Sequence, residues 1–228
     1  MTRRGGAPPP PGERREVDGL VLSCVDVDNA RIARILSRED EVVPVIARHG
    51  RRPSARKTGT RLQPLTAVTA QLTLRPGDDL AGLTGAATYA DFAVLKGDLR
   101  RFGLASTMAE VVLATVPDFA AEAGLHDLVL RAWRWLDSPA NVPVEEVLLL
   151  FELRALGLAG ALPPIDELPG LEDSARRSLT AWAGGQWSLL APRDARAVAT
   201  ALEGLVFAST GRRLKSRPFL DEVLAAPT

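Results

Sequence analysis

The spacing of the apolar residues changes near residue 90, and this change constrains the fold more than any single motif. Between Val17 and about Thr88 the apolar residues are mostly β-branched or short, and they form short runs separated by turn residues. From about Asp91 they recur at helical spacing. The sequence therefore predicts an α+β protein divided by domain, with a disordered extension over 1–16, a β domain over 17–90 and an all-α domain over 91–228.

Short strands bounded by turn residues are expected in the first domain. The expected strands cover 19–27, 30–37, 42–47, 64–75 and 80–88. The run at 30–37 fits a helix or a strand by its period, but its shortness and the turn after it favour a hairpin with the next run. Five short strands with little helix indicate a small β-barrel, of which the OB-fold is a common type.

The second domain is expected to be a helical bundle. A helix over 95–116 should bury a stripe that includes Leu95, Leu99 and Phe102, and a second helix covers 125–136. The stretch "VLLLFELRALGLAG" is apolar nearly all round, which predicts a helix at the centre of the bundle. Further helices are expected at about 171–183, 192–208 and 218–226.

Composition excludes several classes of protein. The 28 basic and 28 acidic residues balance, so an argument for a polyanionic partner must rest on local patches. Cys24 is the single cysteine, which excludes an intrachain disulfide and a cysteine-based zinc site. The N-terminus has no apolar signal region, and no segment has the uninterrupted apolar length of a membrane span. A cytoplasmic protein without a membrane segment is expected.

The stretch from Ile46 to Pro64 holds a concentrated positive charge and no acidic residue. Gly50, Pro53 and Gly59 indicate a loop after the strand at 42–47. The cations repel one another, so a bound polyanion would stabilise this loop. The simpler alternative is a solvated loop, and nucleic-acid contact is the favoured one. The predicted DNA-binding residues are those of the loop and two arginines of the strand at 30–37: Arg31, Arg34, Arg48, Arg51, Arg52, Arg56, Lys57 and Arg61.

Residues 1–88 contain no Phe, Trp or Tyr. Barrels that hold single strands usually stack bases on aromatic rings, each worth roughly 1–3 kcal/mol. The predicted barrel lacks such rings, which suggests that it binds the phosphate backbone and leaves the bases free to pair.

A second basic cluster, here called the late cluster, consists of Arg212, Arg213, Lys215 and Arg217. Cations that follow a helix can satisfy its negative end, which is the structural interpretation. The cluster also suits an anion, and with Phe219 and Leu220 it could receive the acidic, hydrophobic tail of a partner protein.

Catalytic patterns are scarce, and no enzyme is predicted. His49 and His126 lie far apart in the sequence and in no known catalytic motif, so a loop residue and a surface helix residue are expected. Glu145 and Glu146 suit the start of a helix without an acid-base role. The four tryptophans, Trp133, Trp135, Trp182 and Trp187, are expected in the core or along a groove.

Four segments in this order resemble the RecO family of bacterial DNA repair proteins. They are "VIARHGRRPSARKTGTRLQPLT", "LKGDLRRFGLAS", "LLFELRALGLAG" and "GRRLKSRPFL". The resemblance implies an N-terminal OB-fold, a helical domain, and a recombination mediator that binds single- and double-stranded DNA and anneals complementary strands. Such proteins work with RecR, and often with RecF, to load RecA on DNA coated by the single-stranded-DNA-binding protein SSB.

The resemblance also assigns roles to residues. It implies DNA contact for the basic loop and, more weakly, binding of the SSB tail for Lys215 and Arg217. Many relatives carry a four-cysteine zinc module where this chain reads "LPPIDELPGLEDSARRS", so no zinc or other cofactor is expected here. Asp40 stands in a turn where the family often has glycine. Two other interpretations stay open: a protein adaptor that does not bind DNA, and an RNA-binding OB-fold protein.

Overall fold

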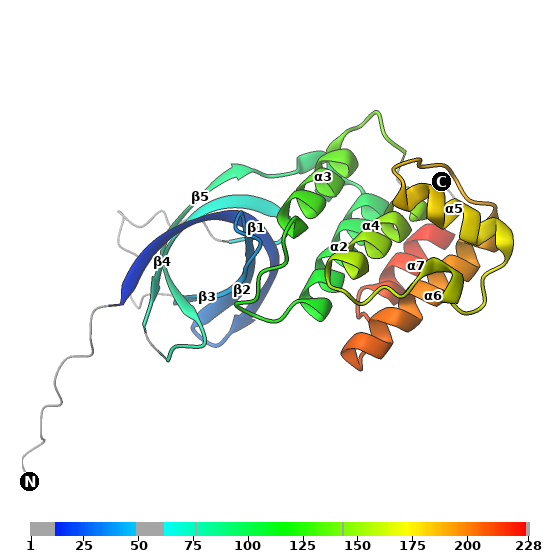
Figure 1. Cartoon of the computed structure of the whole chain (residues 1–228). Coiled ribbons are helices and arrows are strands. Elements are labelled where there is room, and N and C mark those ends of the chain that lie inside the picture. Colours follow the sequence, from blue (N-terminus) through cyan, green and yellow to red (C-terminus); the bar gives the residue numbers. More distant parts are fainter. Residues whose placement is uncertain (1–11, 49–61, 76, 143, 227–228) are drawn as a thin grey trace, which may run out of the picture.

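A closed five-stranded barrel is followed along the chain by a helical bundle (Figure 1). The computed structural model describes residues 12–48, 62–75, 77–142 and 144–226. The strands run in the order β1-β2-β3-β5-β4, and β1 pairs with β4 to close the barrel. They are β1 Glu13–Val27, β2 Ala30–Ser37, β3 Val42–Arg48, β4 Thr66–Leu74 and β5 Ala81–Ala90. The predicted OB-fold class is confirmed.

The barrel begins earlier than expected. β1 starts at Glu13, so residues 13–16, which were assigned to a disordered extension, pair with β4 between Gln71 and Leu74. The sequence did not indicate a strand here because the side chains are polar. The segment is held by backbone hydrogen bonds to β4 and not by burial of its side chains. The expectation for residues 1–11 lies outside the described residues.

The last strand is also longer than expected. β5 continues to Ala90 and therefore includes Tyr89, whose side chain is half exposed. The prediction of a barrel without aromatic residues is therefore wrong, because β5 includes Tyr89. β1 to β4 contain no aromatic residue.

The predicted helix over 95–116 is two helices. α1 Ala93–Gly97 ends before Asp98, whose carboxylate accepts a hydrogen bond from the Arg101 backbone N–H and begins α2 Leu99–Thr115. The break changes the phase of the apolar stripe. Leu99 is 67% exposed and Phe102 36% exposed, although the predicted continuous helix was expected to bury both.

The later helices follow the sequence pattern. They are α3 Leu125–Asp137, α4 Glu145–Leu158, α5 Asp173–Ala183, α6 Pro192–Thr210 and α7 Arg217–Ala225. A 3₁₀ turn over Ile165–Glu167 was not predicted. α4 buries residues all round its axis and packs against α2, α3 and α6, which confirms its central place (Figure 1). None of the helices in the described ranges combines the length and apolar character needed to cross a bilayer.

One apolar core joins the barrel to the bundle. Leu20, Leu36, Val42 and Leu65 of the barrel belong to the same buried cluster as the helical core, while a second cluster fills the barrel itself. The connection between α2 and α3 also pairs with the barrel. The Phe119 backbone N–H donates to the Val42 carbonyl at 2.7 Å, and the Val42 N–H donates to the Ala120 carbonyl at 3.2 Å.

Candidate nucleic-acid interface

Arg48 is the described member of the predicted basic loop. It ends β3, its side chain is exposed, and it pairs with Ala30 in the ladder between β2 and β3. Arg51, Arg52, Arg56, Lys57 and Arg61 lie outside the described residues. The structure therefore locates the start of the basic segment on the barrel surface, at the end of a strand.

Arg31 and Arg34 do not form one patch, because positions three apart on a strand lie on opposite faces. The Arg31 guanidinium donates to both Asp26 carboxylate oxygens, at 2.7 and 2.6 Å, and to the Leu62 carbonyl at 2.8 Å. The hydrogen bond with Asp26 raises the pKa of Arg31, whose side chain is only 12% exposed. Arg31 is thus a structural cation in the described part of the chain.

Arg34 points toward the helical half. Its guanidinium donates to the Asp118 carboxylate at 2.9 and 3.1 Å, and Asp118 lies in the connection between α2 and α3. This pair links the outer face of β2 to the bundle. Its guanidinium remains partly exposed, at 38% for the side chain.

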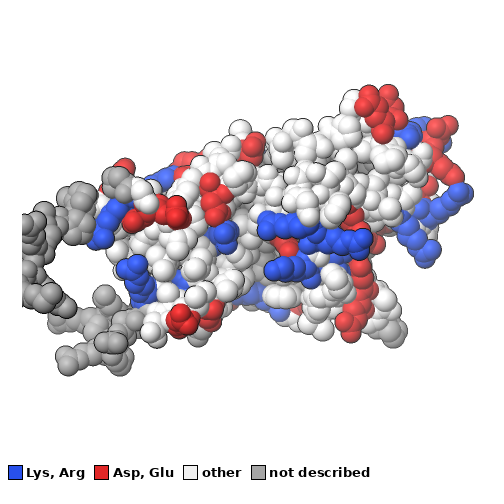
Figure 2. Space-filling view, turned by 90° about the horizontal axis from the view of Figure 1, so that it is seen from below, with Lys and Arg blue, Asp and Glu red and all other residues white. Residues whose placement is uncertain are grey.

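The structure brings Arg34 together with three residues of the late cluster. A hollow of about 600 Å³ lies where β2, the end of α2 and the end of α6 meet. We call it the junction cleft; its charged lining residues are Arg34, Glu110, Asp118, Arg212, Arg213 and Lys215. Seen from below, Lys and Arg side chains gather near the middle of the molecule (Figure 2).

The two carboxylates of the junction cleft already have partners. Asp118 binds Arg34, and Glu110 accepts hydrogen bonds from the backbone N–H groups of Lys215 and Ser216, at 2.8 and 2.7 Å. Arg212 donates to the Leu113 carbonyl at 3.0 Å, so it satisfies the end of α2 rather than that of α6. The helix-end interpretation of the late cluster therefore holds for Arg212, with a different helix.

Arg217 stands apart from the other late cations. Its guanidinium lies 2.7 Å from Glu145, 2.6 Å from Glu203 and 3.2 Å from Asp221, and its side chain is 11% exposed. Burial raises the pKa of Glu145. With three acidic neighbours, Arg217 joins α4, α6 and α7 and is already compensated in the described structure.

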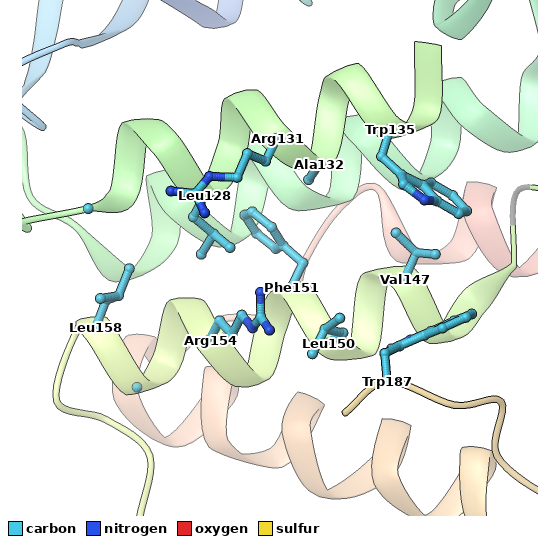
Figure 3. Close-up of a pocket in the computed structure, with 12 residues that line it drawn as sticks. Leu128, Arg131, Ala132, Trp135, Val147, Leu150, Phe151, Arg154, Leu158 and Trp187 are labelled. Atoms are coloured by element: carbon cyan, nitrogen blue, oxygen red, sulfur yellow. The ribbon is translucent and has the colours of Figure 1, made fainter. Parts of the chain in front are cut away.

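A second hollow, whose location the sequence did not indicate, lies between α3 and α4. This α3–α4 groove has a volume of about 620 Å³ and is mostly apolar. Its principal lining residues are Leu128, Trp135, Val147, Leu150, Phe151 and Trp187. In Figure 3 the two tryptophans lie at one end, while Arg131 of α3 and Arg154 of α4 lie on either side nearer the other end. Both arginines are exposed.

The tryptophans divide as their two expected roles suggest. Trp133 and Trp182 are fully buried, whereas Trp135 and Trp187 line the groove. The arginines of the groove were missed, although a signal existed: Arg154 is the lone cation of the apolar segment "LLFELRALGLAG". A cation at the rim of an apolar groove is placed to meet an acidic ligand.

His126 is not the surface residue that was expected. It is 4% exposed in α3, and burial lowers the pKa of its imidazole. The backbone N–H of His126 donates to Asp40 at 2.7 Å, so the start of α3 is held against the barrel. His49 lies outside the described residues. Within the described ranges, no three His, Cys, Asp or Glu side chains are grouped as a metal site would need.

Comparison with known proteins identifies relatives over nearly the whole chain. The family model described as Recombination protein O N terminal matches residues 14–92, and the one described as Recombination protein O C terminal matches residues 96–168. DNA repair protein RecO of Anaeromyxobacter dehalogenans strain 2CP-1 is 31% identical over 250 residues, covering 92% of this chain and 97% of that protein. DNA repair protein RecO of Geobacter metallireducens is 27% identical over 232 residues, covering 94% and 92%. That of Heliobacterium modesticaldum is 38% identical over 136 residues, covering 59% and 47%.

Proposed function

The chain belongs to the RecO family of DNA repair proteins, and from this premise we propose that it is a recombination mediator without catalytic activity. Family membership places its role in DNA repair and recombination. In the proposed mechanism it binds single- and double-stranded DNA, anneals complementary strands and helps load RecA on SSB-coated DNA. RecR and RecF are its proposed partners, and the nucleoid in the cytoplasm is its proposed place of action.

The observation that carries this proposal is the position of Arg48. It is exposed at the end of β3, where the sequence continues into five more cations with no acidic residue before Pro64. Such a segment on a barrel surface would bind phosphates and release their counterions. Because β1 to β4 lack aromatic residues, the bases would stay largely unstacked on the protein and free to pair.

Charge reversal of the basic loop tests this function. We expect the combined change of Arg51, Arg52, Arg56 and Lys57 to Glu to abolish measurable binding of a single-stranded oligonucleotide and annealing of complementary strands. For the unchanged protein, the plot of log affinity against log salt should have a slope of about −4 if about six phosphates are bound. Fluorescence anisotropy measures the affinity, and circular dichroism checks that the variant is folded.

A control with two charge reversals changes Arg177 and Arg196 to Glu, because both are exposed on helices away from the barrel. The control should bind DNA nearly as the unchanged protein does. If the unchanged protein binds no DNA and still binds its protein partners, the adaptor interpretation is correct. Competition between DNA and RNA of equal length tests the RNA-binding interpretation, since phosphate contacts alone discriminate poorly.

We also propose a site for the acidic, hydrophobic tail of SSB. The late cluster was the expected site, but Arg217 there is surrounded by Glu145, Glu203 and Asp221, which would repel an acidic peptide. The α3–α4 groove combines an apolar, aromatic lining with two exposed arginines at its sides. Apolar side chains of the tail would enter the groove, and its carboxylates would meet Arg131 and Arg154.

Two pairs of substitutions distinguish these sites. Arg131→Glu with Arg154→Glu should weaken binding of a labelled SSB tail peptide at least about tenfold, because both charges near the groove are reversed. The Arg177→Glu with Arg196→Glu variant controls for the change in net charge. If Lys215→Ala with Arg217→Ala loses binding of the tail peptide while the groove variant keeps it, the tail binds the late cluster and not the groove.

A further inference from the structure

The junction cleft joins cations that the sequence assigned to two different ligands. Arg34 belongs to the barrel set predicted to bind DNA, whereas Arg212, Arg213 and Lys215 belong to the cluster predicted to bind a protein tail. We infer that they form one site, which binds the phosphodiester backbone of DNA where it leaves the barrel. This inference rests on the proposed function and extends the DNA path onto the helical half of the molecule.

The charge balance of the cleft favours an anion. Four cations face two carboxylates, and each carboxylate has a partner within the protein: Asp118 binds Arg34, and Glu110 binds the backbone at residues 215 and 216. The side chains of Arg213 and Lys215 are exposed and form no hydrogen bond or ion pair in the described part of the structure. An uncompensated arginine and lysine in a hollow attract phosphates and release counterions on binding.

The cleft is also held in shape before any ligand binds. The Glu110 carboxylate accepts hydrogen bonds from the Ser216 hydroxyl and from the backbone N–H groups of Lys215 and Ser216. These bonds fix the turn after α6 against α2. Arg212 is fixed by its bond to the Leu113 carbonyl. Binding there would order mainly the two free side chains, so the entropic cost of binding is small.

The lining of the cleft favours a sugar–phosphate chain over a peptide tail. Its uncharged residues are small or aliphatic, such as Ala114, Val116 and Pro117, and none of its lining residues is aromatic. It therefore offers neither a stacking surface for bases nor an aromatic anchor pocket for a hydrophobic peptide. The volume of about 600 Å³ lies within the usual range for small-molecule sites.

Neutralising the two free cations tests the inference. In Arg213→Gln with Lys215→Gln, the Lys215 backbone N–H that binds Glu110 is kept, so the turn should stay in place. We expect the affinity for a single-stranded oligonucleotide to fall roughly five- to tenfold at low salt. The slope of log affinity against log salt should become shallower by about 1.4 if two phosphate contacts are lost.

Arg177→Gln with Arg196→Gln is the matched control. It removes the same charge from exposed helical positions, and Arg196 lies about 20 Å along α6 from Ser209 of the cleft. The control should keep both the affinity and the salt slope. Equal losses in the two variants would mean that only net charge matters and would overturn the inference.

Two other results would overturn it. Unchanged DNA affinity in the cleft variant, while the charge-reversed basic loop loses DNA, would confine the DNA site to the barrel and leave the proposed function standing. Unchanged DNA affinity with weaker binding of an acidic SSB tail peptide would make the cleft a peptide site. Failure of the unchanged protein to bind DNA would defeat the proposed function itself together with this extension.

Discussion

Glu152 is a fully buried carboxyl group at the centre of the bundle. Neither of its side-chain oxygens has a hydrogen-bond partner in the described structure. The charged groups that act on it are Arg217 of α7, Glu203 of α6 and Glu145 of α4. Burial outweighs the favourable effect of Arg217 and raises the pKa of Glu152 to about 8, so the folded protein keeps this group protonated at neutral pH.

The pH dependence of stability should show this proton. Below the unfolded-state pKa, near 4.5, Glu152 is neutral in both states. Between about 4.5 and 8 the folded state alone retains the proton, so the protein loses stability as the pH rises through this window. We expect Glu152→Gln to be about as stable as the original at pH 5 and more stable by roughly 2–4 kcal/mol at pH 9.

Urea unfolding at several pH values measures this difference. Comparing the two proteins at each pH cancels the contribution of the buried His126, which both retain. A difference that does not change between pH 5 and 9 would show that Glu152 is ionised in the folded state.

Single residues were the hardest scale to predict from the sequence. His126 lies between Leu125 and Asp127 near the start of an amphipathic helix, and its burial follows from tertiary packing at the end of α3 that is held to Asp40. Arg217 was recognised as a cation, but two of its three acidic partners, Glu145 and Glu203, are far from it in the sequence, and only Asp221 is a local i+4 neighbour. Charge can be read from a sequence, whereas its compensation depends on tertiary contacts.

At the scale of elements, the turn between β2 and β3 is also the cap of α3. Asp40 has a φ of 64°, a left-handed conformation that glycine would adopt without strain. Its carboxylate accepts hydrogen bonds from the backbone N–H groups of Gly124 and His126, at 2.8 and 2.7 Å. Aspartate therefore bears the strain and stabilises the N-terminus of a helix in the other half of the molecule.

Replacing Asp40 by glycine should be destabilising despite the relaxed backbone. We expect Asp40→Gly to lower the free energy of unfolding by about 1 kcal/mol, because two hydrogen bonds from the start of α3 to a charged acceptor, one exposed and one partly buried, are lost. Asp28→Gly is the matched control: Asp28 also has a positive φ, 47°, but lies exposed in the hairpin between β1 and β2. The control should change stability by less than about 0.5 kcal/mol.

Thermal unfolding compares the two variants. Equal effects of Asp40→Gly and Asp28→Gly would show that the bonds to α3 contribute nothing beyond the local turn.

Elements were the scale at which the sequence was most informative. Strand alternation and turn residues located all five strands, and helical spacing located α3 to α7 within about two residues at most ends. The failures have local physical reasons. Asp98 interrupts a helix through a side-chain cap that periodicity does not register, and the start of β1 is held by backbone pairing.

At the scale of the whole molecule, the packing of barrel against bundle was not predicted. The sequence does carry a signal, because consecutive apolar residues occur in β1 and β2: Leu20 beside Val21, and Ile35 beside Leu36. All four are buried in the structure. Such runs are typical of strands covered on both faces. The sequence does not say what covers the second face, and only the structure shows that Leu20 and Leu36 pack with the helical core.

A continuous core between two halves removes the hinge that separate domains would have. The barrel surface and the α3–α4 groove consequently keep a constant separation, because both belong to one rigid unit. In the proposed assignment, a nucleic acid on the barrel and a protein tail in the groove cannot be brought together by bending this molecule. Any handover between them must come from slack in the ligands, so linker length in the tail would set how far apart the two can be captured at once.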